Sequence, residues 1–220
     1  MSIKKVYIIR HGQTDFNKQG IVQGSGVDSD LNHIGQEQAV RFFQKYKDVP
    51  FDKVYTSTLK RSIQSVKGFI DLGIPHEKHA GLNEINWGNR EGQRITPEED
   101  AYYHHVLQTW CNGDTHVCIE GGESPDLVTA RQRPFIDLML SRPEEKNILI
   151  CMHGRAMRIL LSNLLHYPLR CMDEFLHKNL CLYQLDFTGS MFVVKKYCDT
   201  SHLKENAPEP GSLFKLPTNS

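Results

Sequence analysis

The chain has 220 residues, of which 39% are hydrophobic and 24% charged, values typical of a globular protein with one substantial core. Lys plus Arg and Asp plus Glu each number 26, so the formal net charge is zero. This balance argues against a nucleic-acid coat or a membrane-surface binder, because both usually carry a basic excess, and any anion site must therefore be local.

Short apolar runs alternate with longer amphipathic ones, the pattern expected of an α/β domain. The last two predicted strands are separated only by Thr188, Gly189 and Ser190, which favours a hairpin. In chain order, we predict a strand at residues 5–9, a helix at 35–47, a strand at 53–57, helices at 59–70 and 127–140, a strand at 147–152, a helix at 155–165, and strands at 180–187 and 191–197.

Two segments interrupt this alternation. Residues 83–125 are rich in Gly, Asn, His and acidic residues, with a possible helix at 97–110, and an insertion of this kind more often covers a site than forms a second domain. The tail at 201–220 contains three prolines and little to bury, so we expect it to be loosely held. We therefore expect one catalytic domain at residues 1–200.

The intracellular location is predicted from the cysteines and the first residues. No apolar run reaches the roughly 20 residues of a membrane span, and MSIKKVYIIRHG lacks the apolar core of a signal peptide. The six cysteines are irregularly spaced without a CxxC pair, which indicates free thiols rather than a disulfide framework. We expect a cytoplasmic protein with no membrane or nucleic-acid partner.

Two apolar strands each lead directly into a His-Gly pair, at His11 in YIIRHGQT and at His153 in ILICMHGRAM. A third strand leads into a helix whose first turn carries Arg61. Ligands in α/β sheets bind beyond the carboxyl ends of the strands, so Arg10, His11, Arg61 and His153 should meet at one rim, near helix N-termini that favour anions. A lone His or Arg at such a place is usually structural, but the combination predicts an anion site.

Metal binding is the alternative for the histidines. His76 and His79 match no recognised metal motif, and the adjacent His104 and His105 cannot face one ion from a helix. Cysteine and carboxylate partners at ligand spacing are missing as well. We therefore predict no metal and no cofactor, with His104 and His105 either at the surface or lining a substrate mouth.

The motifs together resemble those of the histidine phosphatase superfamily, the phosphoglycerate mutase-like family. IIRHGQTDFN resembles its signature, and DSDLNHIGQEQA, VYTSTLKRSIQS, GLNEINWG, GGES and ILICMHGRAM follow in the family's order. Residues 3 to about 198 are covered, and agreement at six separate places makes a chance match improbable. The resemblance implies a three-layer α/β/α sandwich around a mainly parallel sheet.

The resemblance also implies roles for individual residues. His11 would be the nucleophile that accepts the phosphoryl group, and Glu84 the general acid and base. The residues implied to bind phosphate or line the site are Arg10, Arg61 and His153, with Asn17, Gln23, Gly24 and the backbone near Gly154 in support. Arginines suit the charge on the equatorial oxygens of a transferring phosphoryl group, and the imidazole must be neutral to attack.

The segment after Glu84 bears on the reaction. Mutases of the family typically continue this motif as Glu-Arg-His-Tyr-Gly, whereas here Ile85, Asn86, Trp87 and Gly88 follow, which resembles fructose-2,6-bisphosphatase and related broad-specificity phosphatases. We therefore expect hydrolysis of a small phosphorylated metabolite through a phosphohistidine, without metal.

Two alternatives stay open. Phosphoglycerate mutase activity is one, because Arg90, Arg94, His104 or His105 could contact a second phosphate or a carboxylate. A phosphate-binding module without turnover is the other, although such a module could dispense with both the nucleophile and the acid. Periodicity does not separate a core face from a subunit interface, so no oligomeric state is predicted.

Overall fold

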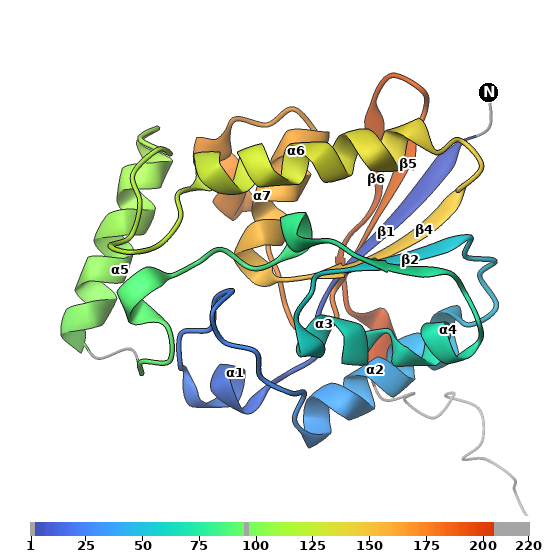
Figure 1. Cartoon of the computed structure of the whole chain (residues 1–220), viewed down its shortest axis with the longest axis horizontal. Coiled ribbons are helices and arrows are strands. Elements are labelled where there is room, and N and C mark those ends of the chain that lie inside the picture. The colour runs from blue at the N-terminus through green and yellow to red at the C-terminus, as the bar shows by residue number, and fades with distance from the viewer. Residues whose placement is uncertain (1–2, 95–96, 205–220) are drawn as a thin grey trace, which may run out of the picture.

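A six-stranded sheet runs through the centre of the computed structural model, which describes residues 3–94 and 97–204 (Figure 1). Its order is β3-β2-β4-β1-β5-β6. The strands are β1 (Lys4–Arg10), β2 (Lys53–Thr56), β3 (His76–Lys78), β4 (Asn147–Met152), β5 (Leu182–Phe187) and β6 (Phe192–Asp199). The first four run parallel, whereas β5 and β6 are antiparallel to their neighbours. The predicted mainly parallel sheet with an antiparallel final hairpin is confirmed.

Helices cover both faces of the sheet and complete three layers (Figure 1). One face carries α2 (His33–Tyr46), α3 (Lys60–Ser65) and α4 (Lys67–Asp71), and the other carries α6 (Pro125–Ser141) and α7 (Gly154–Leu164). The helix α5 (Pro97–Cys111) stands to one side, and α1 (Asp15–Gln19) follows β1. Short 3₁₀ turns lie at η1 (Ala80–Leu82), η2 (Gly88–Arg90), η3 (Leu169–Glu174) and η4 (Ser201–Leu203). No helix in these described ranges combines the length and apolar character needed to cross a bilayer.

The core divides into two clusters because successive strand residues point to opposite faces of the sheet. On β1, Val6 and Ile8 belong to the cluster under α6 and α7, whereas Tyr7 and Ile9 belong to the cluster under α2 and α4. All four side chains are buried. A strand that is apolar on both faces, as here, is the type that a doubly covered parallel sheet requires.

The ends of the central strands meet at one rim. β1 and β4 are parallel neighbours, so the residues that follow them lie together, and the His11 N–H donates to the Met152 carbonyl at 3.0 Å. Because β5 is antiparallel to β1, the start of β5, rather than its end, lies at this rim. The Leu180 N–H, just ahead of β5, donates to the Arg10 carbonyl at 3.0 Å.

One predicted helix is divided in the structure, and one strand appears that the sequence does not predict. The single helix expected at 59–70 is divided at Val66, where φ is −116° and ψ is 12°. The hydroxyls of Ser62 and Ser65 donate to the carbonyls of Leu59 and Arg61, side-chain bonds of a kind that often bends helices. The edge strand β3 was not predicted, since His-Glu-Lys has no apolar alternation.

The short segments at the two ends of the domain also differ from expectation. The unpredicted one-turn helix α1 depends on a capping box between Thr14 and Asn17 rather than on apolar periodicity. In the predicted tail, His202 is buried, with its ring centroid 5.1 Å from that of Phe42. The packed domain thus extends past residue 200, and the remaining tail, 205–220, lies outside the described residues.

Candidate active site

His11 is held in one tautomer by its own loop. Its Nδ1 lies 2.7 Å from the Gly12 carbonyl oxygen, which can only accept, so Nδ1 carries the proton and Nε2 keeps its lone pair. Burial, and then the charges of Arg61 and Arg10, hold the pKa of His11 well below 6.5. Gly12 is required here because a Cβ would lie 2.6 Å from the Gly35 carbonyl oxygen. The ring is therefore neutral with a free nitrogen.

The second imidazole, His153, has partners at both nitrogens. Its Nδ1 accepts from Arg61 Nε at 3.2 Å, because a guanidinium only donates, so the neutral ring donates from Nε2 to Ser57 Oγ at 2.7 Å. Burial, followed by Arg61 and His11, keeps its pKa well below 6.5. The His11 and His153 ring centroids are 5.1 Å apart. Two neutral imidazoles thus lie side by side at the rim.

Arg61 connects this pair to the loop that follows α1. Its side chain is fully buried, and Nη1 and Nη2 donate to the carbonyls of Val27 at 2.5 Å and Gly24 at 3.0 Å. Burial lowers its pKa to about 10, which leaves it charged at neutral pH. Arg61 therefore supports His153 and the loop from behind, whereas the neighbouring Gln23 lines the pocket itself.

Glu84 reaches the rim from the segment after η1, and it binds the first turn of α7. One carboxylate oxygen accepts from the N–H groups of Ile85 at 2.9 Å and Ala156 at 2.8 Å, and the other accepts from the Arg155 N–H at 3.1 Å. The sequence predicts an anion site near helix N-termini. These two α7 amides hold the protein's own carboxylate, which a helix N-terminus favours through its dipole.

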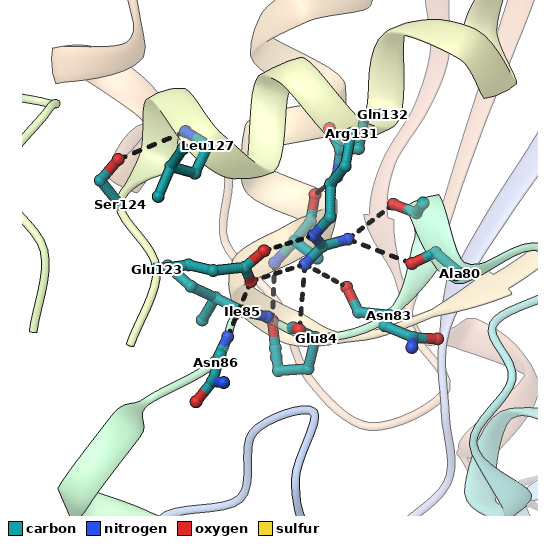
Figure 2. A network of polar contacts seen from close by, with 12 residues as sticks. Ala80, Asn83, Glu84, Ile85, Asn86, Glu123, Ser124, Leu127, Arg131 and Gln132 are labelled. Atoms are coloured by element: carbon teal, nitrogen blue, oxygen red, sulfur yellow. Dashed lines mark hydrogen bonds and ion pairs between the residues drawn. The ribbon is translucent and has the colours of Figure 1, made fainter. Parts of the chain in front are cut away.

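Arg131 on α6 fixes the backbone that carries Glu84 (Figure 2). Its guanidinium donates to the carbonyls of Gly81 at 2.8 Å and of Asn83 and Glu84 at 3.0 Å each. It also forms a bidentate pair with Glu123, at 2.8 and 3.1 Å. The same Glu123 carboxylate accepts from the Asn86 N–H at 2.9 Å. We call Arg131 and Glu123 the clamp, since together they bind both sides of Glu84.

A pocket of about 180 Å³ opens at this rim, and cations predominate in it. Its lining residues are Arg10, Asn17, Val22, Gln23, Glu84, Trp87, Tyr103, Gly154, Arg155, Arg158 and His177. Asp173 pairs with both Arg155, at 2.5 Å, and Arg158. The three lining arginines, Arg10, Arg155 and Arg158, therefore outnumber the two nearby carboxylates, Glu84 and Asp173. The buried Arg61 behind the pocket adds a further positive charge. The pocket suits a small dianion.

Asn17 and Asn179 join the two sides of the rim. Asn17 Oδ1 accepts from the Thr14 N–H at 3.3 Å and from Asn179 Nδ2 at 3.2 Å, which leaves the Asn17 NH₂ for the pocket. Asn179 Nδ2 also donates to the His11 carbonyl at 3.0 Å. This bridge ties α1, the nucleophile loop and the segment before β5 into one unit.

The structure brings every predicted site residue to one place, although in different positions. Arg10, Asn17, Gln23, Glu84 and Gly154 line the pocket, and the remaining four, His11, Gly24, Arg61 and His153, contact them or one another. Sequence reasoning missed Arg155, Arg158, His177, Asn179, Ser57 and the clamp. Arg155 and Arg158 follow His153 in the first turns of α7, so their spacing could have indicated them. Ser57 and Glu123 lie within the quoted motifs VYTSTLKRSIQS and GGES but were given no role, whereas His177, Asn179 and Arg131 lie outside every motif.

The other candidate residues lie elsewhere. His104 and His105 are exposed on α5 and do not line the pocket. Arg90 and Arg94 line an adjoining, mostly apolar pocket that shares Val22, Trp87 and Tyr103 with the first. His76 Nε2 lies 2.9 Å from Thr56 Oγ1, and no group of three or more His, Cys, Asp or Glu side chains in residues 3–94 and 97–204 could hold a metal ion.

Known proteins with similar sequences and folds match nearly the whole chain. A Yersinia pestis protein named "Probable phosphoglycerate mutase GpmB" is 30% identical over 208 residues, covering 90% of this chain and 94% of that one. The α-ribazole phosphatase of Shigella flexneri superposes with a TM-score of 0.78 at 26% identity, covering 89% of this chain and 96% of that one.

A third protein shows the same fold at lower identity. The mycobacterial glucosyl-3-phosphoglycerate phosphatase superposes with a TM-score of 0.79 at 23% identity, covering 90% of this chain and all of that one. The family model of the histidine phosphatase superfamily, branch 1, matches residues 6–200. With this match spanning most of its length, the chain belongs to the histidine phosphatase superfamily, branch 1.

Proposed function

We propose that the protein hydrolyses a small phosphomonoester through a phosphohistidine at His11, without a metal ion. The observation that carries the proposal is the fixed tautomer of His11, in which the Nδ1–H bond to Gly12 leaves Nε2 as a free nucleophile. Arg10, Arg155 and Arg158 in the pocket supply the positive charge that phosphoryl transfer requires. A small phosphorylated metabolite is the substrate class that a pocket of this volume fits.

In the first step, the His11 Nε2 lone pair forms a bond to phosphorus as the bond from phosphorus to the ester oxygen breaks. The leaving alkoxide takes a proton from the Glu84 carboxyl group, which gives free alcohol, phosphohistidine and a carboxylate. Arg10, the Asn17 amide and the backbone at Gly154 bind the phosphoryl oxygens. Arg61 donates to His153 Nδ1 and holds the ring in place. The His153 Nε2–H, which donates to Ser57 Oγ in this structure, donates to a phosphoryl oxygen of the substrate instead.

In the second step, water attacks the phosphorus of phosphohistidine. The Glu84 carboxylate accepts a proton from this water as the bond between phosphorus and nitrogen breaks, and the electron pair returns to His11 Nε2. Inorganic phosphate leaves, and both side chains are back in their starting protonation states. Glu84 thus serves once as acid and once as base.

Hydrolysis is favoured over a mutase reaction by the residues after Glu84. Ile85 is fully buried, and Trp87 lines the pocket with an uncharged indole, so neither position offers a cation that could hold a substrate carboxylate. One observation keeps the mutase as second candidate, since Arg155 and Arg158 line the pocket together with Arg10 and could hold a carboxylate. The relatives carry names of both kinds, a phosphoglycerate mutase and two phosphatases.

We propose the cytoplasm as the site of action. All six cysteines are free thiols in the structure, and Cys151 and Cys181 are buried without a disulfide partner. Such thiols suit a reducing compartment.

The test is inorganic phosphate release from phosphosugars, bisphosphates and phosphoglycerates in the presence of a metal chelator. Wild type is compared with His11→Ala and with the control His105→Ala, which changes an exposed histidine outside the pocket. We expect chelator-resistant release that only His11→Ala abolishes, with a phosphoryl group trapped on wild type by rapid quench. Release by His11→Ala at the wild-type rate contradicts the proposal, and interconversion of 3- and 2-phosphoglycerate without release favours the mutase.

A further inference from the structure

His177 contacts Arg10, the arginine beside the nucleophile. Its Nδ1 lies 3.2 Å from Arg10 Nη1. A guanidinium has only donors, so the imidazole nitrogen must be the acceptor in this bond. His177 Nδ1 therefore carries no proton, and the neutral ring has its proton on Nε2.

Burial and three guanidinium groups keep this ring neutral. Arg10 faces it from the end of β1, and Arg155 and Arg158 face it from α7. Burial together with these charges lowers the pKa of His177 to about 3. A protonated ring would present an N–H to the Arg10 donor and add a fourth cation to the pocket. His177 is thus an acceptor throughout the neutral pH range.

The position of the ring is fixed by its surroundings. A Cβ added at Gly154 would lie only 2.9 to 3.2 Å from three atoms of the His177 ring, so glycine at this position lets the ring approach the start of α7. On the other side, the Leu180 N–H bond to the Arg10 carbonyl joins the segment before β5 to the end of β1. The ring and the arginine are therefore held against each other by the backbone.

Arg10 has little else to orient it. Within residues 3–94 and 97–204, the only hydrogen bond of its side chain goes to His177, and its buried Nε has no partner. The guanidinium lines the pocket, so its Nη donors outside the bond to His177 are the ones available to a bound anion, whereas the Nε–H is buried. The direction of those donors depends on the one contact to the imidazole.

We propose that His177 is a positioning residue, whose unprotonated Nδ1 orients Arg10 toward the phosphoryl group. The inference rests on the proposed function, because it assigns Arg10 to the phosphoryl oxygens. Its role is one of alignment, and small errors in the placement of a transition-state ligand reduce the rate strongly. No other described residue accepts a hydrogen bond from this guanidinium.

Three substitutions separate the acceptor from the rest of the ring. Asparagine places its Oδ1 near the position of Nδ1, glutamine places a donor near Nε2, and phenylalanine keeps the ring without either nitrogen. We expect His177→Phe to lower kcat/KM for the best phosphomonoester about 10- to 100-fold, the effect of losing a bond to a charged group. His177→Asn should restore most of this loss and His177→Gln should not.

A double-mutant cycle shows whether the effect passes through Arg10. If it does, Arg10→Ala and Arg10→Ala/His177→Phe have the same kcat/KM. If the two residues act independently, the fold-losses of the single variants multiply in the double variant. The exposed His105→Phe on α5 is the control for placing an aromatic side chain in the protein, and thermal unfolding reports any loss of fold. The proposal is overturned if His177→Phe keeps wild-type activity, if His177→Gln but not His177→Asn restores activity, or if the fold-losses of the two single variants multiply in the double variant.

Two readouts do not depend on turnover. Nitrogen-15 NMR of the histidines should show His177 neutral and protonated on Nε2 from pH 5 to 8. Binding of vanadate, a phosphate analogue, should weaken in His177→Phe and recover in His177→Asn. If wild type releases no phosphate but both readouts hold, the proposed hydrolase activity fails and the positioning role stands. An Nδ1–H tautomer, or equal vanadate affinity in both variants, rejects the positioning role.

Discussion

Replacing Arg131 with methionine removes one half of the clamp while keeping most of the aliphatic volume. The substitution breaks the bidentate pair with Glu123 and the bonds to the carbonyls of Gly81, Asn83 and Glu84. Breaking a fully buried ion pair costs about 3–5 kcal/mol. The two side chains are 24% and 23% exposed, so water replaces part of what is lost, and we expect a cost of about 3 kcal/mol. For a domain of this size, that lowers Tm by roughly 6–12 °C.

The assay is urea unfolding at pH 7.5 together with thermal unfolding, with Arg133→Met as the matched control. Arg133 lies on the same helix but is 75% exposed, so its replacement should change stability by no more than about 0.5 kcal/mol. Adding Glu123→Gln to Arg131→Met should recover part of the loss, since it removes the unpaired carboxylate. Equal stability of the Arg131 and Arg133 variants would refute the reasoning, because the clamp would then be worth no more than a surface pair.

Three further predictions concern the site itself. Glu84→Gln should form phosphohistidine from an aryl phosphate at nearly the wild-type rate but hydrolyse it at least 100-fold more slowly, so rapid-quench experiments should show a burst. An unchanged steady-state rate of phosphate release argues against Glu84 as the base. The pKa values of His11 and His153 are lowered on folding, so the unfolded chain binds more protons than the folded one below pH 6.5. The free energy of unfolding should therefore fall by about 1.4 kcal/mol per pH unit for each histidine as the pH drops from 6.5 toward the folded pKa values. A urea midpoint that is constant from pH 7 to 5 contradicts this. Gly12→Ala should impair folding and activity together, because its Cβ would meet the Gly35 carbonyl, and soluble, fully active Gly12→Ala would show that the loop can move aside.

Residues after parallel strands were predictable because topology requires them to meet. Arg10 ends β1, His11 and His153 directly follow β1 and β4, and the strands themselves are evident from unbroken apolar runs. Glu84 has no such signal, and its assignment came from the resemblance of GLNEINWG to a known segment. Local chemistry therefore indicated an anion site, and the family supplied the acid.

The missed residues have a common physical explanation. His177 and Asn179 precede β5, and only the antiparallel direction of that strand brings its start to the rim. Arg131 is one of two arginines on the amphipathic helix α6, and the backbone carbonyls that it binds lie about 50 residues earlier in the chain. None of these three residues can be distinguished in the sequence from a solvated surface residue until the sheet order and the helix packing are known.

The direction of β1 has a practical consequence for handling the protein. The strand begins at Lys4 and delivers its last residue, Arg10, to the pocket, so its seven residues span about 23 Å between the two ends of the sheet. A fusion partner, affinity tag or sensor surface joined ahead of Lys4 is therefore attached at the end of the sheet opposite the pocket. Immobilised through this end, the molecule presents its pocket to the solution, which suits flow assays of phosphate esters.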